Sequence, residues 1–352
     1  MQKSDQASFK KKWFVILFVL TIITPICITY FLDPISFNYT WPGGEPIAHR
    51  ARVLYLFFLW LIFLEIILVW KNFIQKDFSS FKGWKTFILI SLAAAPSIYA
   101  IITNLSPVSE AIVELGKLVG VLQILLEVFW PLSLEYLALT LLFTLFILFA
   151  YGKIGLKFFA VSLLFLGAIG TVYMVNTLYP FGAFTPFQFF VPFTASSAAQ
   201  VLNWMGYKTR LFFATHKVSG AELPVIEVIG TGVKFGIDFP CAGVQSLFIY
   251  TFTVLLLLKQ MNTHVVSKIV YFVIGAVGTY IVNILRVVSI FLIAIHQGRD
   301  AAITFHDFYG EFFAMTWIVL YLMIVVVIHK RGSWRKLQIL IREISEKCRS
   351  SI

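Results

Sequence analysis

The sequence predicts an all-α polytopic membrane protein with about eight transmembrane helices and with both termini in the cytoplasm. Hydrophobic residues make up 59% of the 352 residues and charged residues only 13%, and the mean hydropathy is +0.88. Several apolar runs reach the ~20 residues that a spanning helix needs. Lysine and arginine concentrate in alternate loops, as expected when the positively charged loops stay in the cytoplasm.

Each predicted span is an apolar run bounded by a polar or turn-rich segment. The expected spans are residues 13–32, 53–70, 84–103, 132–151, 156–178, 241–258, 268–295 and 306–328. An interfacial piece is expected at 111–130. The segments assigned to the cytoplasm carry 19 of the 28 Lys and Arg residues, and the opposite side carries 8. Residues 187–205 are apolar but contain several polar side chains. If they also spanned, the number of spans would be odd and Cys241 would lie inside.

Residues 207–240 have a different pattern. From Leu223 to Phe239, β-branched residues alternate with others, and Gly230-Thr231-Gly232 interrupts the alternation. This pattern is typical of a β-hairpin. Because the edges of a hairpin cannot lie in hydrocarbon, we expect a small β-hairpin region on the extracytoplasmic side or shielded by protein.

Composition excludes several classes of function. The three cysteines, Cys27, Cys241 and Cys348, are far apart, which excludes a disulfide framework and a cysteine-rich metal site. The net charge of +11 is explained by membrane topology, so we expect no nucleic-acid partner. We expect no cofactor and no metal, since neither HExxH nor paired CxxC occurs. A metal site is conceivable only from scattered residues: Cys241, His306, His296 and Asp238.

Two reactive side chains open predicted spans. Cys241 follows Pro240 near a predicted helix N-terminus, where the helix dipole favours the thiolate. The alternative is a buried structural cysteine. His306 opens the last span, and Gly310, one turn later, leaves room for close backbone approach. Histidine can accept and donate a proton near pH 7. The alternative here is a solvated interfacial histidine.

Arg286 lies inside a predicted span, where an arginine costs ~2.5–3.5 kcal/mol on insertion scales. Asn283 is three residues earlier on the same helix face, and we expect both to direct donors at one point and Asn283 to bind substrate. The alternatives for Arg286 are snorkelling or an ion pair with one of three acidic residues: Glu227, Asp307 or Glu311. In the predicted orientation Cys241, Arg286 and His306 can meet in the outer half of the membrane. A thiol, an imidazole and a fixed cation are the minimal set for acyl transfer.

The order of these motifs resembles the exosortase/archaeosortase family of polytopic membrane cysteine transpeptidases. The motifs are Pro240-Cys241-Ala242-Gly243-Val244-Gln245-Ser246, Asn283-x-x-Arg286 and His306-x-x-x-Gly310. The resemblance covers about residues 155–328 and implies a catalytic membrane core there. It also implies a variable membrane region of about four helices at 1–154 and a basic cytoplasmic tail at 329–352. By motif, Cys241 corresponds to the nucleophile, Arg286 to the oxyanion-stabilising cation and His306 to the third catalytic position. Ala242 and Val244-Gln245 depart from the usual bacterial pattern, which leaves the recognition motif open.

The resemblance implies a cell-membrane enzyme whose active site faces the extracytoplasmic side. Its substrates would be surface proteins with a C-terminal sorting signal, consisting of a short motif, a transmembrane helix and a basic cluster. Cleavage through a thioester would pass the acyl group to an acceptor, with a membrane lipid as one candidate. The alternatives are a transporter that uses Arg286 to bind an anionic substrate and a non-catalytic assembly subunit. The sequence contains no internal repeat or paired half-helices that would favour a transporter.

Overall fold

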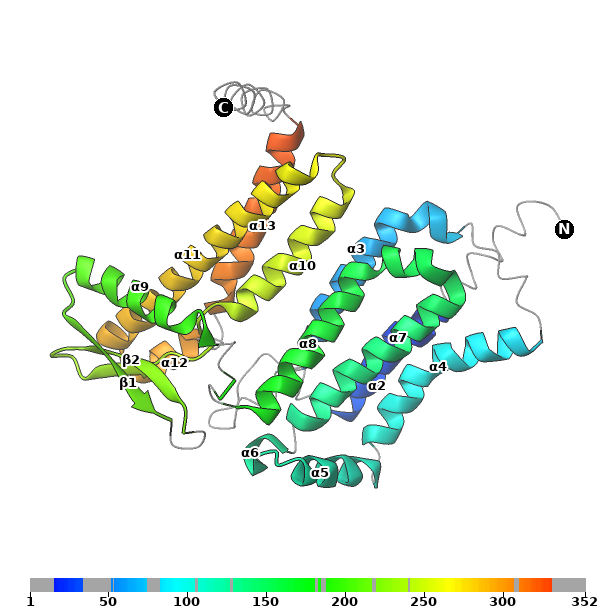
Figure 1. Ribbon diagram of the computed structural model, residues 1–352, viewed down its shortest axis with the longest axis horizontal. Helices are drawn as coiled ribbons and strands as arrows, with labels where there is room; N and C mark the ends of the chain where they lie inside the picture. Colours follow the sequence, from blue (N-terminus) through cyan, green and yellow to red (C-terminus); the bar gives the residue numbers. More distant parts are fainter. Residues whose placement is uncertain are drawn as a thin grey trace, which may run out of the picture. The chain divides into compact units, whose positions relative to one another are not determined.

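The computed structural model divides the chain into two compact units (Figure 1). It describes residues 16–33, 52, 54–74, 83–104, 107–126, 129–180, 183–184, 188–216, 220–239, 241–306 and 310–330. The N-terminal unit comprises Met1–Phe184 with Lys217–Ala221, and the C-terminal unit comprises Thr185–His216 with Glu222–Ile352. The boundary predicted at residues 154–155 concerns variation within a family, which packing does not test. The structure does place the helix that follows it in the N-terminal unit.

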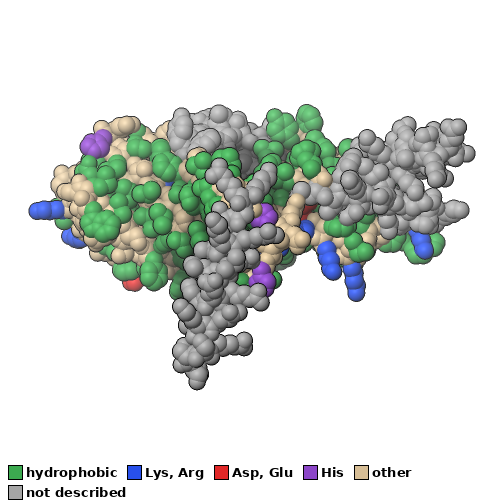
Figure 2. Space-filling model, turned by 90° about the horizontal axis from the view of Figure 1, so that it is seen from above, with side chains coloured by type: hydrophobic (Ala, Val, Ile, Leu, Met, Phe, Trp, Pro, Cys, Tyr) green, Lys and Arg blue, Asp and Glu red, His purple; other side chains and the backbone are tan. Residues whose placement is uncertain are grey.

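The described helices follow the predicted spans closely. Four are long and apolar enough to cross a membrane: Trp84–Asn104, Phe129–Phe158, Ala160–Leu178 and Val265–Gln297. Four shorter apolar helical segments fall on the other predicted spans: Ile16–Leu32, Leu54–Ile67, Ser246–Gln260 and Phe313–His329. Many large hydrophobic side chains are exposed, and Figure 2 shows them spread over the described surface with few charged side chains among them, as expected for a lipid-facing exterior. The helical class with a small sheet is confirmed, and the number of spans and their orientation stay predictions.

The N-terminal unit is entirely helical in its described part. Its elements are η1 (Val19–Ile23), α2 (Thr24–Leu32), α3 (Leu54–Ile74), α4 (Trp84–Asn104), α5 (Val108–Leu118), α6 (Gln123–Leu126), α7 (Phe129–Phe158) and α8 (Ala160–Leu178). Non-helical backbone at Gly152 kinks α7 where a turn between two spans was predicted. The predicted interfacial piece at 111–130 is two short helices, α5 and α6, and α5 begins earlier than expected.

The carboxylate of Glu65 connects α3 to α8 through hydrogen bonds. Glu65 of α3 is 1% exposed and accepts hydrogen bonds from three groups at the start of α8. The donors are Val161 N at 3.1 Å, Ser162 N at 3.2 Å and Ser162 Oγ at 2.6 Å. The first N–H groups of a helix have no partner within the helix, and the helix dipole favours a negative charge beside them. Glu65 therefore caps α8 from a neighbouring helix.

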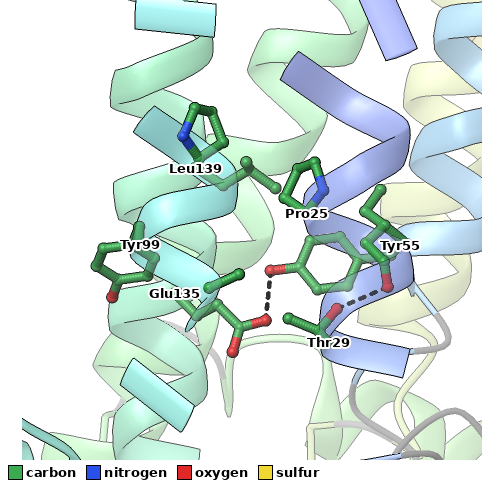
Figure 3. Close-up of a pocket in the computed structure, with 9 residues that line it drawn as sticks. Pro25, Thr29, Tyr55, Tyr99, Glu135 and Leu139 are labelled. Carbon is green, nitrogen blue, oxygen red and sulfur yellow. Dashed lines mark hydrogen bonds between the residues drawn. The ribbon is translucent and has the colours of Figure 1, made fainter. Parts of the chain in front are cut away.

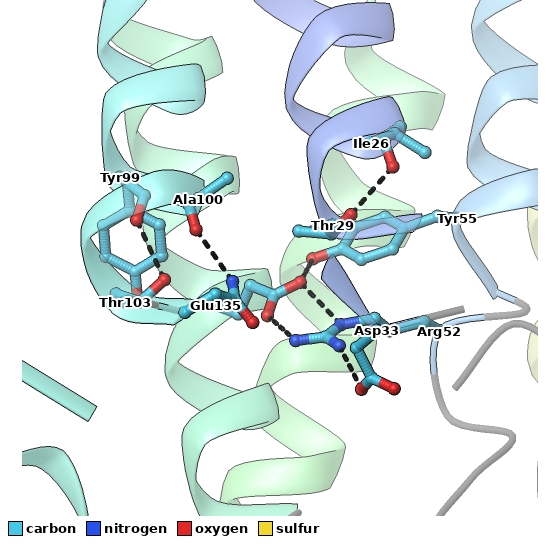
Figure 4. A network of polar contacts seen from close by, with 10 residues as sticks. Ile26, Thr29, Asp33, Arg52, Tyr55, Tyr99, Ala100, Thr103 and Glu135 are labelled. Atoms are coloured by element: carbon cyan, nitrogen blue, oxygen red, sulfur yellow. Dashed lines mark hydrogen bonds and ion pairs between the residues drawn. The ribbon is translucent and has the colours of Figure 1, made fainter. Parts of the chain in front are cut away.

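A second buried carboxylate of this unit lies in an ionic network (Figure 4). Glu135 of α7 accepts from Arg52 Nε at 3.1 Å, from Arg52 Nη2 at 2.6 Å and from Tyr55 Oη at 3.0 Å. Arg52 Nη1 also donates to Asp33 Oδ2 at 2.7 Å. Tyr55 and Glu135 line a cavity of about 10 Å³, enough for about one water molecule (Figure 3). This volume leaves no room for a larger ligand.

The C-terminal unit combines helices with a three-stranded antiparallel sheet. Its elements are α9 (Val191–Trp204), β1 (Thr209–Thr215), β2 (Glu222–Val228), β3 (Val233–Gly236), α10 (Val244–Gln260), α11 (Val265–Gln297), α12 (Arg299–Thr304) and α13 (Gly310–Lys330). The strand order is β1-β2-β3, with Phe212 opposite Val225 and Ile226 opposite Phe235. The predicted hairpin is therefore β2 and β3, and the prediction missed a third strand, β1.

The length of α9 bears on the open question about residues 187–205. α9 has 14 residues, which at ~1.5 Å per residue is roughly 21 Å, short of the ~30 Å hydrocarbon core. α9 instead packs beside the sheet and α11 (Figure 1). This favours an even number of spans.

Close helix packing sets the framework that carries the candidate site. Gly275 of α11 faces the rings of Tyr250 from α10 and Tyr321 from α13, and Gly278 faces Trp317 of α13. A Cβ atom at either glycine would overlap these rings. Small residues let membrane helices approach closely, so α10, α11 and α13 form one packed group.

Candidate active site

Cys241 lies in a tight turn between β3 and α10. The backbone N–H groups of Cys241 and Ala242 both donate to the carbonyl oxygen of Asp238, each at 3.0 Å. The Asp238 carboxylate accepts from its neighbour Phe239 N at 2.7 Å and from Gln188 Nε2 at 2.7 Å. Asp238 therefore closes the turn through its backbone and anchors it through its side chain.

Asn283 of α11 holds the other side of this turn. Its side-chain nitrogen donates to the carbonyl oxygen of Cys241 at 2.9 Å, and the residue is 1% exposed. Gly243, the N-cap residue immediately before α10, has φ +87°, and a Cβ atom there would lie 2.8 Å from Asn283 Cγ and Nδ2. Only glycine meets both demands, a left-handed backbone and contact with an amide side chain. Asn283 and Gly243 together fix the position of Cys241.

The thiol of Cys241 faces the imidazole of His306. Cys241 Sγ and His306 Nε2 are 3.4 Å apart, within hydrogen-bond reach for sulfur. Cys241 is in the turn that precedes α10, outside the helices. Burial raises the pKa of its thiol, but the hydrogen bond and charge of His306 and the charge of Arg286 outweigh burial, so the pKa is lowered overall. A lowered pKa enlarges the fraction of thiolate, the nucleophilic form of cysteine.

Arg286 of α11 contacts the backbone of His306. Arg286 Nη2 is 3.4 Å from the carbonyl oxygen of His306, and the residue is 8% exposed. Its Nε has no hydrogen-bond partner among the described residues. A Cβ atom at Gly310 would lie 2.5 Å from that Nε, so the absence of a side chain there makes room for the guanidinium. Sequence reasoning linked Gly310 to the histidine ring, and the structure shows that it accommodates Arg286.

The described residues show no ion pair between Arg286 and the acidic residues considered as its partners. Glu227 lies 3.7 Å from Arg210 across the β1–β2 ladder. Asp307 and the side chain of Glu311 lie outside the described residues.

A cavity of about 210 Å³ opens at the Cys241–His306 pair. It is lined by Phe235, Gly236, Ile237, Cys241, Val287, Ile290, Phe291, Ala302, Ile303 and His306. These residues come from β3 and the chain after it, from α11 and from the α12 region. Apart from Cys241 and His306, every lining residue that the structure describes is apolar or glycine. The site can therefore present a nucleophile and a base to a group bound in an apolar chamber.

The four predicted site residues thus meet in one place. The transmembrane exosortase family model matches residues 45–325 of this chain. This chain belongs to the transmembrane exosortase family. It is accordingly a transmembrane protein of a protein-sorting protease family. Neither the curated proteins nor the solved structures contain a match to it.

The match extends further than the resemblance read from the sequence. The motifs indicated about residues 155–328, whereas the exosortase model begins at residue 45 and includes most of the N-terminal unit. The network of Arg52 and Glu135 therefore also lies within the matched region.

Sequence reasoning missed several residues that position the candidate site. Gln188 and Asp238 bond across 50 positions of the chain, and Thr194 Oγ1 reaches the carbonyl oxygen of Ala242 at 3.4 Å. The only sequence signal was that polar residues interrupt an otherwise apolar stretch at 187–205. Asn283 was recognised, but it contacts the backbone of Cys241, and its predicted substrate-binding role stays a prediction.

The described residues contain no group of three or more His, Cys, Asp or Glu side chains placed to hold a metal. His296, one of the residues considered for such a site, is instead 2.9 Å from the hydroxyl of Tyr207. Cys27 is an exposed free cysteine of the N-terminal unit, and Cys348 lies outside the described residues.

Proposed function

We propose that this protein is a membrane-embedded cysteine transpeptidase in which Cys241 is the nucleophile and His306 the general base. The observation that carries the proposal is the 3.4 Å contact between Cys241 Sγ and His306 Nε2 at the wall of an apolar cavity. A nucleophile within reach of a base is the arrangement that covalent catalysis requires.

In the first half-reaction the thiol proton passes to His306 Nε2 and the sulfur attacks a backbone carbonyl of the substrate. The C–N bond then breaks, and the imidazolium returns its proton to the leaving amine. The product is a thioester on Cys241 and a released C-terminal membrane segment. In the second half-reaction an acceptor nucleophile attacks the thioester, its proton passes to His306, and the thiol is regenerated.

Arg286 stabilises the negative charge in this scheme. Its guanidinium favours the thiolate before attack, and we propose that it also stabilises the oxyanion that develops on the substrate carbonyl. Arg286 is not among the described residues that line the cavity, and its guanidinium donates to the His306 carbonyl oxygen at 3.4 Å. Its second proposed role is therefore to hold His306 in register with Cys241. Asn283 acts on the other partner by holding the Cys241 backbone.

We propose that the substrates are surface proteins with a C-terminal motif, a transmembrane helix and a basic cluster. The reaction takes place at the extracytoplasmic side of the cell membrane, with a lipid head-group amine as the candidate acceptor. Charge asymmetry supports this side, because 19 of the 28 Lys and Arg residues lie in segments assigned to the cytoplasm. The short α9 supports it too, because an additional span would reverse the orientation of the helices that follow.

The test is substrate processing in cells, read as the gel shift of a surface protein with such a tripartite C-terminus. We expect Cys241→Ala to abolish processing and Arg286→Ala and His306→Ala to slow it by at least about a hundredfold, the usual contribution of a positioned base or oxyanion donor. Cys27→Ala is the matched control and should process normally. Membrane levels of each variant are measured in parallel. Undiminished processing by Cys241→Ala would remove the basis of the proposal and favour the transporter alternative, which no contact of Arg286 with the described residues supports.

A further inference from the structure

The sheet of the C-terminal unit has a free edge at β3. β3 pairs with β2, and no other strand among the described residues pairs with it. Ile237 N donates to Pro224 O at 2.9 Å, which shows that the odd-numbered residues of this segment bond toward β2. Backbone groups of successive strand residues point to opposite sides in the sheet plane. The N–H and C=O groups of Lys234 and Gly236 therefore point away from the sheet, and both residues are exposed.

This edge borders the cavity that contains Cys241 and His306. Phe235, Gly236 and Ile237 form one wall of that cavity. A Cβ atom at Gly236 would meet nothing nearer than Val225 Cγ2 at 4.0 Å, so an incoming chain can approach the backbone here. Gly236, one of the two residues with outward backbone groups, and Cys241 therefore border the same cavity.

We propose that the substrate segment preceding the scissile bond binds as an extended strand along the free edge of β3. This inference rests on the proposed function. The outward groups of Lys234 and Gly236 hydrogen-bond to the substrate backbone, as in other peptide sites built by strand addition. Alternate side chains of an extended peptide point to opposite sides, so one substrate side chain enters the cavity.

The cavity defines the chemical class of that side chain. Its volume of about 210 Å³ is below the ~300–1,000 Å³ of pockets that enclose a whole small molecule, and it suits a single side chain. Burying a charge against its apolar walls would carry a large desolvation cost. The side chain is therefore uncharged and apolar.

A peptide fits this edge better than the other possible occupants. A lipid tail would leave the backbone groups of Lys234 and Gly236 without partners. A second copy of the chain, paired edge to edge, would bring the exposed Lys234 side chains of the two copies close together. Lysine on an edge strand is a common device against such self-pairing.

The test compares two reagents on the full-length chain in membranes, with Cys27→Ala and Cys348→Ala so that Cys241 is the only thiol. Iodoacetamide reports the intrinsic reactivity of Cys241. Acetyl-Ala-Ala-Leu chloromethyl ketone reports the reactivity of the same thiol toward a reagent that carries a short peptide. The measured quantity is the labelling rate with the peptide reagent divided by the rate with iodoacetamide. A change in the reactivity of the thiol itself affects both rates and cancels in this ratio. The same chain unfolded in denaturant gives the ratio for an ordinary cysteine.

Backbone changes in both the peptide and the protein then test for strand addition. Two further probes carry an N-methyl group on one or the other of the two alanine amides. Alternation predicts that one methyl group lowers the ratio by about tenfold, and the other changes it by less than about threefold. In the protein, Gly236→Pro removes an outward N–H and should also lower the ratio by about tenfold. Phe213→Pro is the matched control, because the N–H of Phe213 points outward from β1, the opposite edge, and the ratio should stay the same.

Equal ratios for both N-methylated probes, or an unchanged ratio in Gly236→Pro, would overturn strand addition. So would an equal loss in Phe213→Pro. The proposed function has a different point of failure. If iodoacetamide labels Cys241 in the folded chain no faster than in the unfolded chain, and His306→Ala does not change the rate, the thiol is not activated. If the thiol is activated but the peptide probe has no advantage, only the strand inference fails.

Discussion

The role of Gly243 gives the sharpest prediction about how the site is held. Gly243→Ala introduces two costs. A left-handed backbone costs an L-residue ~1–2 kcal/mol, and the new Cβ would lie 2.8 Å from the Asn283 side chain. Asn283 must then release the Cys241 carbonyl, and losing a buried hydrogen bond costs about 1–3 kcal/mol. Because Asn283 and Gly243 fix the turn, the thiol should move relative to His306.

Gly206→Ala separates the two costs. Gly206 has φ +94°, close to that of Gly243, but a Cβ atom there would meet nothing within 4 Å. Both variants therefore pay the same backbone strain, and only Gly243→Ala displaces Asn283. A misplacement of ~1 Å can cost about a hundredfold in rate, so Gly243→Ala should slow processing by about tenfold to a hundredfold. Gly206→Ala should stay within about twofold at equal membrane level.

A double mutant tests the cause directly. Asn283→Ala removes the two atoms that would lie 2.8 Å from the new Cβ, Cγ and Nδ2, and leaves only the Cβ of residue 283 at 3.0 Å. The Gly243→Ala/Asn283→Ala double variant should therefore be less impaired than the two single effects combined. The assay is the substrate gel shift, normalised to the membrane level of each variant. Two results would refute the reasoning: Gly243→Ala as mild as Gly206→Ala, or single effects that simply add.

Three further predictions follow from other contacts. Gly310→Ala places a Cβ 2.5 Å from Arg286 Nε, so processing should fall at least about tenfold at a normal membrane level; normal processing would contradict the packing. His306 and Arg286 lower the pKa of Cys241, so its thiolate persists to lower pH than that of an ordinary cysteine. In a plot of alkylation rate against pH, His306→Ala should therefore shift the midpoint to higher pH. An unchanged midpoint would count against the contact between Cys241 and His306. Arg52→Ala leaves the buried Glu135 without its cation and should lower the free energy of unfolding by about 3–5 kcal/mol. We expect a lower Tm in detergent for this variant and a partly restored Tm for the double variant Arg52→Met/Glu135→Leu. An unchanged Tm in Arg52→Ala would argue against the network.

Features encoded locally in the chain were predictable. Apolar runs of about 20 residues predicted the helices, and alternation after Leu223 predicted β2 and β3. β1 was missed because Leu211-Phe212-Phe213-Ala214 is a continuous apolar run without alternation. Its strand conformation depends on pairing with β2, which a local pattern does not show.

The candidate site was predictable as a set of residues but not as a set of contacts. Cys241, Arg286 and His306 were grouped because each is costly or reactive inside an apolar segment. That Asn283 bonds to a backbone carbonyl depends on the turn at Gly243, which only the folded chain defines. Two further pairings depend on tertiary packing, because the partners are far apart in the sequence. Gln188 lies 50 positions from Asp238, and Arg52 lies 83 positions from Glu135.

The most direct test of the central claim is capture of the acyl-enzyme on Cys241. The full-length protein is co-expressed with a surface protein carrying a tripartite C-terminus and is then isolated under acid, which slows hydrolysis of thioesters. Peptides containing Cys241 are analysed by mass spectrometry before and after neutral hydroxylamine, which cleaves thioesters. We predict that the new C-terminus of the substrate is attached to Cys241, is released by hydroxylamine and is absent in His306→Ala. Processing of the same substrate without any adduct on Cys241, or undiminished in Cys241→Ala, would contradict the account.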